Sequence, residues 1–298
     1  MVSVNVGVAK ALPYRAILEL ADRLAPAFRR AFLDAVAGLQ DDLTLSELAD
    51  AFARRDSTIL RTSGAWQAFR QKLGANLDAA VEQAITQAGT HAISQLPDSV
   101  QAQMRFDLTN PAALDAIDTV NAAIIGDLVN VSAQGIEDAL RRAFLAGVSP
   151  GATAQRIRSY IGLTPQATNA VDRYRDGLLS RDVAVGRAQD LADAYARRLL
   201  RQRATVIART ETIRAAVAGQ QAAWADATTR GLLDPDTTSQ WLVTPDDRLC
   251  PLCEAVPDMN PDGVPLGTPF QTPLGAVSGP PLHPMCRCAV VLNQGAMV

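Results

Sequence analysis

The sequence predicts a mainly α-helical protein, with an elongated helical body that includes a long helix, and a small Pro/Gly-rich C-terminal module with little or short β structure. Three observations support this fold class. Apolar residues recur at three- and four-residue steps through residues 1–235. Nine of the 17 prolines then lie in residues 251–284, a density through which a helix cannot continue. All four cysteines lie in residues 250–288.

Changes in composition divide the chain into three expected regions. Residues 1–110 form an N-terminal helical region without a recognisable motif. Residues 111–235 form a helical domain that ends in a long helix, and residues 236–298 form the C-terminal module. A chain of 298 residues with 48% hydrophobic and 20% charged residues is long enough and apolar enough for folded domains of this kind.

Capping residues delimit the expected helices. Thr44 and Glu47 fit a capping box that opens a short helix. An apolar stripe from Trp66 to Ile85 predicts a helix face that is buried in the core or in a subunit interface. The later prolines fit first helical turns, at Pro111, Pro150 and Pro165.

These signals predict a series of helices in the second region. The last is so long that we expect a break in it or a protruding arm. The expected ranges are 111–128, 131–146, 152–161, 165–177 and 182–229.

Charge and motifs exclude several classes of protein. A net charge of −3 gives no global positive field, which argues against a general DNA-coating protein. No apolar run is long enough for a membrane span, and the N-terminus lacks the pattern of a secretory signal. Neither a phosphate-binding loop nor a dinucleotide fingerprint occurs. We therefore expect no membrane partner and no small-molecule substrate, and synthesis in a cytosol that keeps thiols reduced.

Five residues of the C-terminal module are candidate metal ligands. Cys250 and Cys253 form a C-x2-C pair, and His283, Cys286 and Cys288 follow after a 29-residue loop. Both sulfurs of a C-x2-C pair can reach one tetrahedral ion. Cys250, Cys253 and Cys288 are the favoured ligands, and the sequence does not choose between His283 and Cys286 as the fourth.

One structural Zn²⁺ ion is the expected cofactor. Four protein ligands saturate tetrahedral zinc and leave no position for a catalytic water. No histidine–glutamate helix motif supplies a general base, so no catalytic residue is expected. The alternatives are disulfides formed late in an oxidising environment, free thiols, or another metal.

The C-terminal strings resemble those of a known family. They are ARTET at 208–212, DDRLCPLC at 246–253 and GPPLHPMCRC at 279–288, with Gly219, Trp224 and Trp241 between them. This ordered set resembles the C-terminal domain of phage Mu F-type minor head proteins over roughly residues 125–293. Met285 departs from the family pattern, which usually has Asn there.

The resemblance implies a low-copy structural protein of a tailed phage or prophage, not an enzyme. It implies a place in the virion, at or inside the portal vertex, after synthesis in the bacterial host cytoplasm. The implied partners are the portal protein and/or the major capsid protein. The implied role is in head assembly, with packaged DNA as a further contact during packaging or delivery.

Five polar residues of these strings are candidates for docking the module onto the long helix. Arg209 is expected to reach a carbonyl or carboxylate of the module, and Glu211 to meet Arg248 or Arg287. Asp246 or Asp247 is expected to accept hydrogen bonds from backbone amides in the turn before Cys250. The alternative is that these are ordinary solvated charges.

Two other functions remain open from the sequence. The first is a phage-associated enzyme or toxin, either a zinc nuclease or an ADP-ribosyltransferase-like protein. The second is a zinc-stapled DNA-binding module, although the loop between the ligand pairs is acidic and rich in proline. Nuclease assays with added metal and salt-dependent DNA binding discriminate these functions from a structural role.

Overall fold

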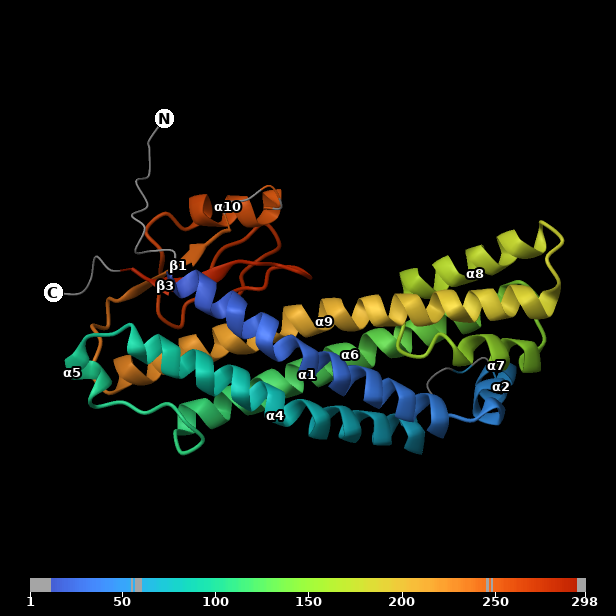
Figure 1. The fold of residues 1–298 in the computed structure, drawn as a ribbon, viewed down its shortest axis with the longest axis horizontal. Helices are drawn as coiled ribbons and strands as arrows, with labels where there is room; N and C mark the ends of the chain where they lie inside the picture. The colour runs from blue at the N-terminus through green and yellow to red at the C-terminus, as the bar shows by residue number, and fades with distance from the viewer. Residues whose placement is uncertain (1–11, 55, 57–60, 245–246, 248, 294–298) are drawn as a thin grey trace. The chain divides into compact units, whose positions relative to one another are not determined.

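The expectation of a mainly α-helical fold is confirmed in the computed structural model (Figure 1). None of the described helices is both long and apolar enough to cross a membrane. The structure describes residues 12–54, 56, 61–244, 247 and 249–293. Its helices are α1 (Leu12–Asp42), α2 (Leu45–Arg54), α4 (Gly64–Ser94), α5 (Asp98–Gln101), α6 (Pro111–Leu145), α7 (Pro150–Arg158), α8 (Pro165–Leu179), α9 (Val185–Thr229) and α10 (Pro251–Met259).

The chain divides into two compact units that cut across the three regions expected from the sequence. Unit 1 takes the chain up to Phe28, Asp78–Asn121 and the chain from Val206 onward. Unit 2 takes Arg29–Leu77 and Ala122–Thr205. The two divisions differ because α1, α4, α6 and α9 each run past a unit boundary, so distant parts of the sequence share each core.

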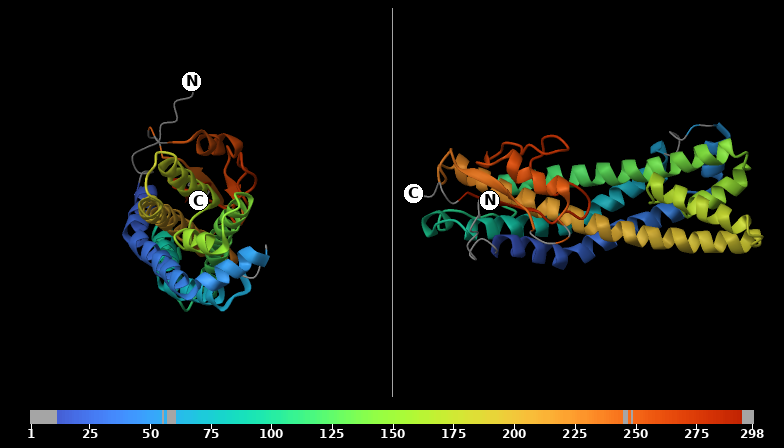
Figure 2. Two further views of the ribbon diagram at one scale, coloured as in Figure 1. Left: turned by 90° about the vertical axis from the view of Figure 1, so that its right-hand side faces the viewer. Right: turned by 90° about the horizontal axis from the view of Figure 1, so that it is seen from above.

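Unit 1 contains a small antiparallel sheet with the order β2-β1-β3. Strand β1 (Thr238–Leu242) pairs with β2 (Val264–Pro265) and with β3 (Ala289–Leu292). Trp241 of β1 is buried against Phe270 in an edge-to-face contact, with ring centroids 5.4 Å apart. Trp241 therefore packs within the module. The sheet and α10 lie beside the C-terminal part of α9 (Figures 1 and 2).

Unit 2 is made of helices packed around buried side chains. Helix α2 packs against α7, and α8 runs beside the N-terminal part of α9 (Figure 2), with Tyr174 and Tyr195 in ring contact. Arg203 of α9 is half-buried, donates a hydrogen bond to the Gly162 carbonyl and lies over the Phe32 ring. Burial lowers the pKa of Arg203 to about 10, so this side chain remains charged at neutral pH.

The capping signals are confirmed. The Thr44 N–H donates to Glu47 Oε2 at 2.8 Å, and the Glu47 N–H donates to Thr44 Oγ1 at 3.1 Å, which is the reciprocal capping box. Ser149 and Thr164 cap α7 and α8, and each is followed by proline in the first turn. These helix starts were predictable because each depends on residues within one turn of the chain.

Three expectations about helix continuity were wrong. Helix α6 runs unbroken through residues 129–130, since Val129 is buried there and neither residue is a helix breaker. Of the break or protruding arm expected for the last helix, the break does not occur, because α9 is continuous over 45 residues and contains no proline. The proline-rich segment does form a helix, α10, because Pro251 occupies its first position and Pro257 lies near its end.

Candidate metal centre

The first half of the site lies at the N-terminus of α10. Cys250 is the N-cap residue, and its Sγ accepts a hydrogen bond from the Cys253 backbone N–H at 3.4 Å. Pro251 holds the first helical position, where its missing N–H removes no helical hydrogen bond. The C-x2-C spacing thus places both sulfurs at a helix N-terminus, where the helix dipole favours negative charge.

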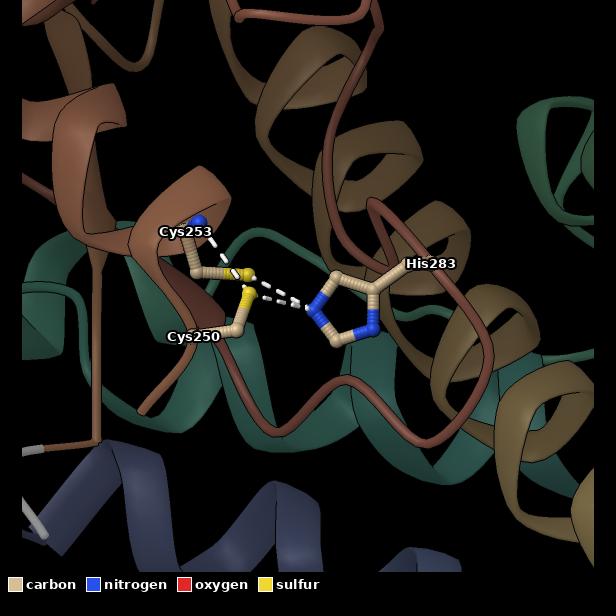
Figure 3. A group of neighbouring side chains, drawn as sticks. All are labelled: Cys250, Cys253 and His283. Carbon is tan, nitrogen blue, oxygen red and sulfur yellow. Dashed lines mark hydrogen bonds between the residues drawn. The ribbon is translucent and has the colours of Figure 1, made fainter. Parts of the chain in front are cut away.

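The His283 imidazole points at both of these sulfurs (Figure 3). Its Nε2 lies 3.0 Å from Cys250 Sγ and 3.1 Å from Cys253 Sγ. Its Nδ1 lies 2.9 Å from the Pro284 carbonyl oxygen. A proton on Nδ1 is donated to that carbonyl, which leaves the Nε2 lone pair directed at the sulfurs. Metal-ligating histidines are commonly oriented in this way by a backbone carbonyl.

Cys286 and Cys288 join the cluster from the segment that leads into β3. A turn closed by the Cys286 N–H, which donates to the His283 carbonyl at 3.1 Å, brings Cys286 into the site. Its Sγ lies 3.7 Å from Cys253 Sγ. Cys253, Cys286 and Cys288 are buried, and all four cysteines are free of disulfide bonds.

Two overlapping triads of ligand atoms share Cys253. In each triad, Cys250–Cys253–His283 and Cys253–Cys286–Cys288, the ligand atoms all lie within 4.8 Å of one another. Around tetrahedral zinc, with Zn–S near 2.3 Å, sulfurs lie about 3.8 Å apart, close to the 3.7 Å between Cys253 and Cys286. The cavity among these residues is about 20 Å³, a volume for an ion and not for an organic substrate. The cluster could therefore bind a metal ion.

Local hydrogen bonds favour thiolates at two of the four cysteines. A hydrogen bond with Cys288 lowers the pKa of the Cys286 thiol to about 5, despite burial. Burial raises the pKa of the Cys250 thiol, but hydrogen bonds from Cys253 outweigh it and leave the pKa lowered. Burial and the charge of Cys286 raise the pKa of the Cys253 thiol. A divalent cation would neutralise the two thiolates and displace the proton from Cys253.

The structure gives two of the expected docking residues partners on helices. Arg209 Nη1 forms an ion pair with Asp22 of α1 at 2.8 Å, and among the described residues Arg209 has no partner in the module. Glu211 Oε2 accepts from Arg214 Nε on the next turn of α9 at 2.8 Å. Arg209 therefore connects two helices of unit 1, α9 and α1.

The other expected docking residues are placed as follows. Asp246 and Arg248 lie outside the described residues. The backbone carbonyl of Arg287 accepts a hydrogen bond from Thr244 Oγ1 at 2.7 Å. That bond links the two ligand-bearing segments to each other through the backbone of Arg287.

Three residues that the sequence did not single out hold the module against α9. Thr210 Oγ1 accepts a hydrogen bond from the Met285 N–H at 3.1 Å. Gln221 Nε2 donates to the Ser278 carbonyl, and Gly279 packs against Val217. Thr210 lies inside the ARTET string, so its position in the motif was a usable signal. Nothing local to Gln221 predicted its partner.

A comparison of the chain with protein-family models, with curated proteins and with solved structures finds no match.

Proposed function

We propose that this chain is a non-enzymatic minor head protein of a tailed phage or prophage, of the phage Mu F type. The observation that supports the proposal is the meeting of Cys250, Cys253, His283 and Cys286 in one cluster. These residues belong to the strings on which the resemblance rests. The ARTET string adjoins the same cluster, through the hydrogen bond between Thr210 and Met285. Motifs that are far apart in the sequence thus meet in one module.

The proposed metal is one structural zinc ion. Three thiolates and an imidazole suit Zn²⁺ better than they suit Mg²⁺ or Ca²⁺, which prefer oxygen ligands. Four such ligands leave no open coordination position, which supports a structural role over a hydrolytic one. The chain links the ligand pairs by a long loop with little secondary structure, so metal binding would contribute directly to folding the module.

The proposed place of action is the virion, at or inside the portal vertex. There the protein would contact the portal protein and/or the major capsid protein during head assembly. Contact with packaged DNA, during packaging or delivery, belongs to the same proposal. The support for this role is the resemblance, together with a cavity of only about 20 Å³ at the cysteine cluster, which is too small for an organic substrate.

Metal content and proteolysis test the zinc module. We expect about one zinc per purified chain by elemental analysis, and loss of zinc in the Cys250→Ser/Cys253→Ser double variant. Leu252→Ser, an exposed change between the two cysteines, is the matched control and should retain zinc. Only the double variant should gain protease sites within residues 236–293. A zinc-free wild type with a protease-resistant module would contradict the proposal.

Procapsid assembly tests the role in the head. The chain is co-expressed with the portal and major capsid proteins of the same phage, and the particles are purified. We expect a few copies per particle with wild type and with Leu252→Ser, and far fewer with the cysteine double variant. Absence of wild-type protein from the particles, or metal-dependent nuclease or ADP-ribosyl-transfer turnover, would overturn the proposed function.

A further inference from the structure

Unit 2 contains a cavity of about 150 Å³ between α6, α7 and α8 that carries an excess of positive charge. Four arginines and two aspartates line it, so the formal charges of +4 and −2 leave +2. Arg173 and Asp176 are exposed, which places the opening of the cavity at the surface. The charged lining residues are Arg142, Arg156, Asp172, Arg173, Arg175 and Asp176.

Both aspartates are already engaged by hydrogen bonds. Asp172 accepts from the Tyr160 hydroxyl at 2.6 Å and from Arg142 Nε at 3.1 Å. Asp176 accepts from Arg175 Nη2 at 2.7 Å. The remaining Arg142 nitrogens donate to other side chains around them. The pairing of Arg142 is therefore complete, and among the described residues neither aspartate accepts a hydrogen bond from Arg156.

The guanidinium groups of Arg156 and Arg175 are less well compensated. Among the described residues, the half-buried Arg156 side chain has no hydrogen-bond or ion-pair partner. Arg175 is only 5% exposed, and its buried Nε and Nη1 form no hydrogen bond, although Nη1 lies 3.6 Å from the Asp172 carboxylate. Burial and repulsion by Arg175 lower the pKa of Arg156, yet arginine remains protonated at neutral pH.

We propose that this cavity binds one phosphate-type oxyanion between Arg156 and Arg175. Guanidinium groups match the oxygen atoms of phosphate in pairs, and such charge-assisted hydrogen bonds are among the strongest in proteins. Asn169 also lines the cavity, and its side chain has no hydrogen bond among the described residues, so its amide adds a neutral donor. The volume takes a single phosphate group and not a nucleoside. The ligand is inorganic phosphate, or the phosphate of an ester whose remainder lies outside.

This assignment gives Arg156 a role that helix packing does not require. Arg142 and Asp172 connect α6 and α8 through their ion pair, and Arg175 is buried, so replacement of these residues would disturb the fold as well as the cavity. Arg156 connects no elements and is free to be replaced. The inference concerns unit 2 and does not depend on the metal cluster in unit 1.

Calorimetric titration with inorganic phosphate, at constant ionic strength, tests the proposal on the full-length zinc-loaded chain. Arg156→Gln should weaken phosphate binding about tenfold or more, the loss expected for a charge-assisted contact. Arg158→Gln is the matched control, since Arg158 is an exposed arginine on the same helix that does not line the cavity. Arg158→Gln should leave binding unchanged, and circular dichroism should show both variants equally helical.

A second titration, with a nucleoside 5′-monophosphate, separates the two sources of phosphate. Binding as tight as that of inorganic phosphate would identify an ester as an acceptable ligand, and weaker binding would identify free phosphate. The proposal is overturned if phosphate binds no better than chloride, or if Arg156→Gln binds phosphate as well as wild type does.

Discussion

Five donor residues surround a site that needs four, and their contacts rank them. Cys250, Cys253 and His283 lie in mutual contact, and Cys286 reaches Cys253. Cys286 and Cys288 both group with Cys253, and neither groups with Cys250 or His283, so their thiol chemistry decides between them. The Cys288 thiol lowers the pKa of Cys286 by hydrogen bonding, which makes Cys286 the better thiolate ligand and Cys288 its supporting donor. We therefore expect Cys288, which the sequence favoured as a ligand, to be the surplus residue.

The ligand ranking predicts opposite results for two neighbouring serine variants. Cys288→Ser should keep about one metal per chain, because a serine hydroxyl can still donate to Cys286. Cys286→Ser should lose the metal or bind it far more weakly. Cobalt substitution reports the difference, since thiolate–cobalt absorption depends on the number of sulfur ligands. Loss of metal from Cys288→Ser with retention by Cys286→Ser would reverse the assignment.

Metal affinity should fall as the pH is lowered. The pKa of the Cys253 thiol is raised by burial and by the charge of Cys286, so metal must displace its proton. For His283, the Pro284 carbonyl and nearby thiolates outweigh burial and raise the pKa, so the imidazole protonates early as the pH falls. Both effects act against binding at low pH. A competition titration with a chromophoric chelator from about pH 8 to about pH 6 should show this trend, and pH-independent affinity would contradict it.

Met285 occupies a backbone conformation that suits another residue better. Its φ of 62° lies in the left-handed region, which asparagine tolerates more readily than a long side chain does. The side chain is 43% exposed, and the contact with Thr210 uses the backbone N–H. Met285→Asn should therefore stabilise the turn by up to about 1 kcal/mol, seen as a higher thermal midpoint with unchanged metal content. A lower midpoint would show that the methionine side chain contributes packing of its own.

At the scale of elements, helix ends were predictable and helix contacts were not. Thr44, Ser149 and Thr164 were identified as caps because a capping residue and its partners lie within one turn of the chain. The continuity of α9 depends on burial against segments far away in the sequence, so it cannot be predicted from neighbouring residues alone. The density of prolines in this segment disfavours a helix, but Pro251 occupies a first helical position, where proline is favoured. The helix at Pro251 therefore follows from the position of that proline.

Gly219 allows α9 and α4 to approach closely within unit 1. A Cβ atom at Gly219 would lie 2.3 Å from the Ile85 carbonyl oxygen, a backbone atom that can move away only if the helix moves. Gly219→Ala should destabilise the protein by about 1–3 kcal/mol, as overpacked core sites do.

The control for this prediction is Gly126→Ala, at an exposed position within α6 where an added Cβ meets nothing within 4 Å. It should stabilise the protein by about 0.5–1 kcal/mol through helix propensity. Urea denaturation followed by circular dichroism measures both changes. Equal changes in the free energy of unfolding for the two substitutions would mean that α9 and α4 are not tightly packed at Gly219.

At the scale of the whole molecule, the cysteine cluster was more predictable than the division into units. The ligands come as two short strings, and the chemistry of cysteine and histidine at these spacings is enough to bring them together as candidates. The contacts among these ligands depend on the path of the intervening loop. That path brings His283 to both Cys250 and Cys253. The division into units follows from pairing between distant helix segments, for which the sequence contains no local signal.

Because each unit has its own buried core, metal removal should act on the module and leave unit 2 folded. Unit 2 buries Phe32, Trp66, Phe69 and Tyr160 without using any candidate ligand. Residues 236–293 have fewer large buried side chains, chiefly Trp241 and Phe270, so their stability should depend on the ion. After chelation we expect hydrogen exchange to become fast in 236–293 and to stay slow in the helices of unit 2, with recovery on addition of zinc. Equal loss of protection in unit 2 would mean that the ion stabilises the whole chain, and unchanged exchange in 236–293 would mean that the module folds without it.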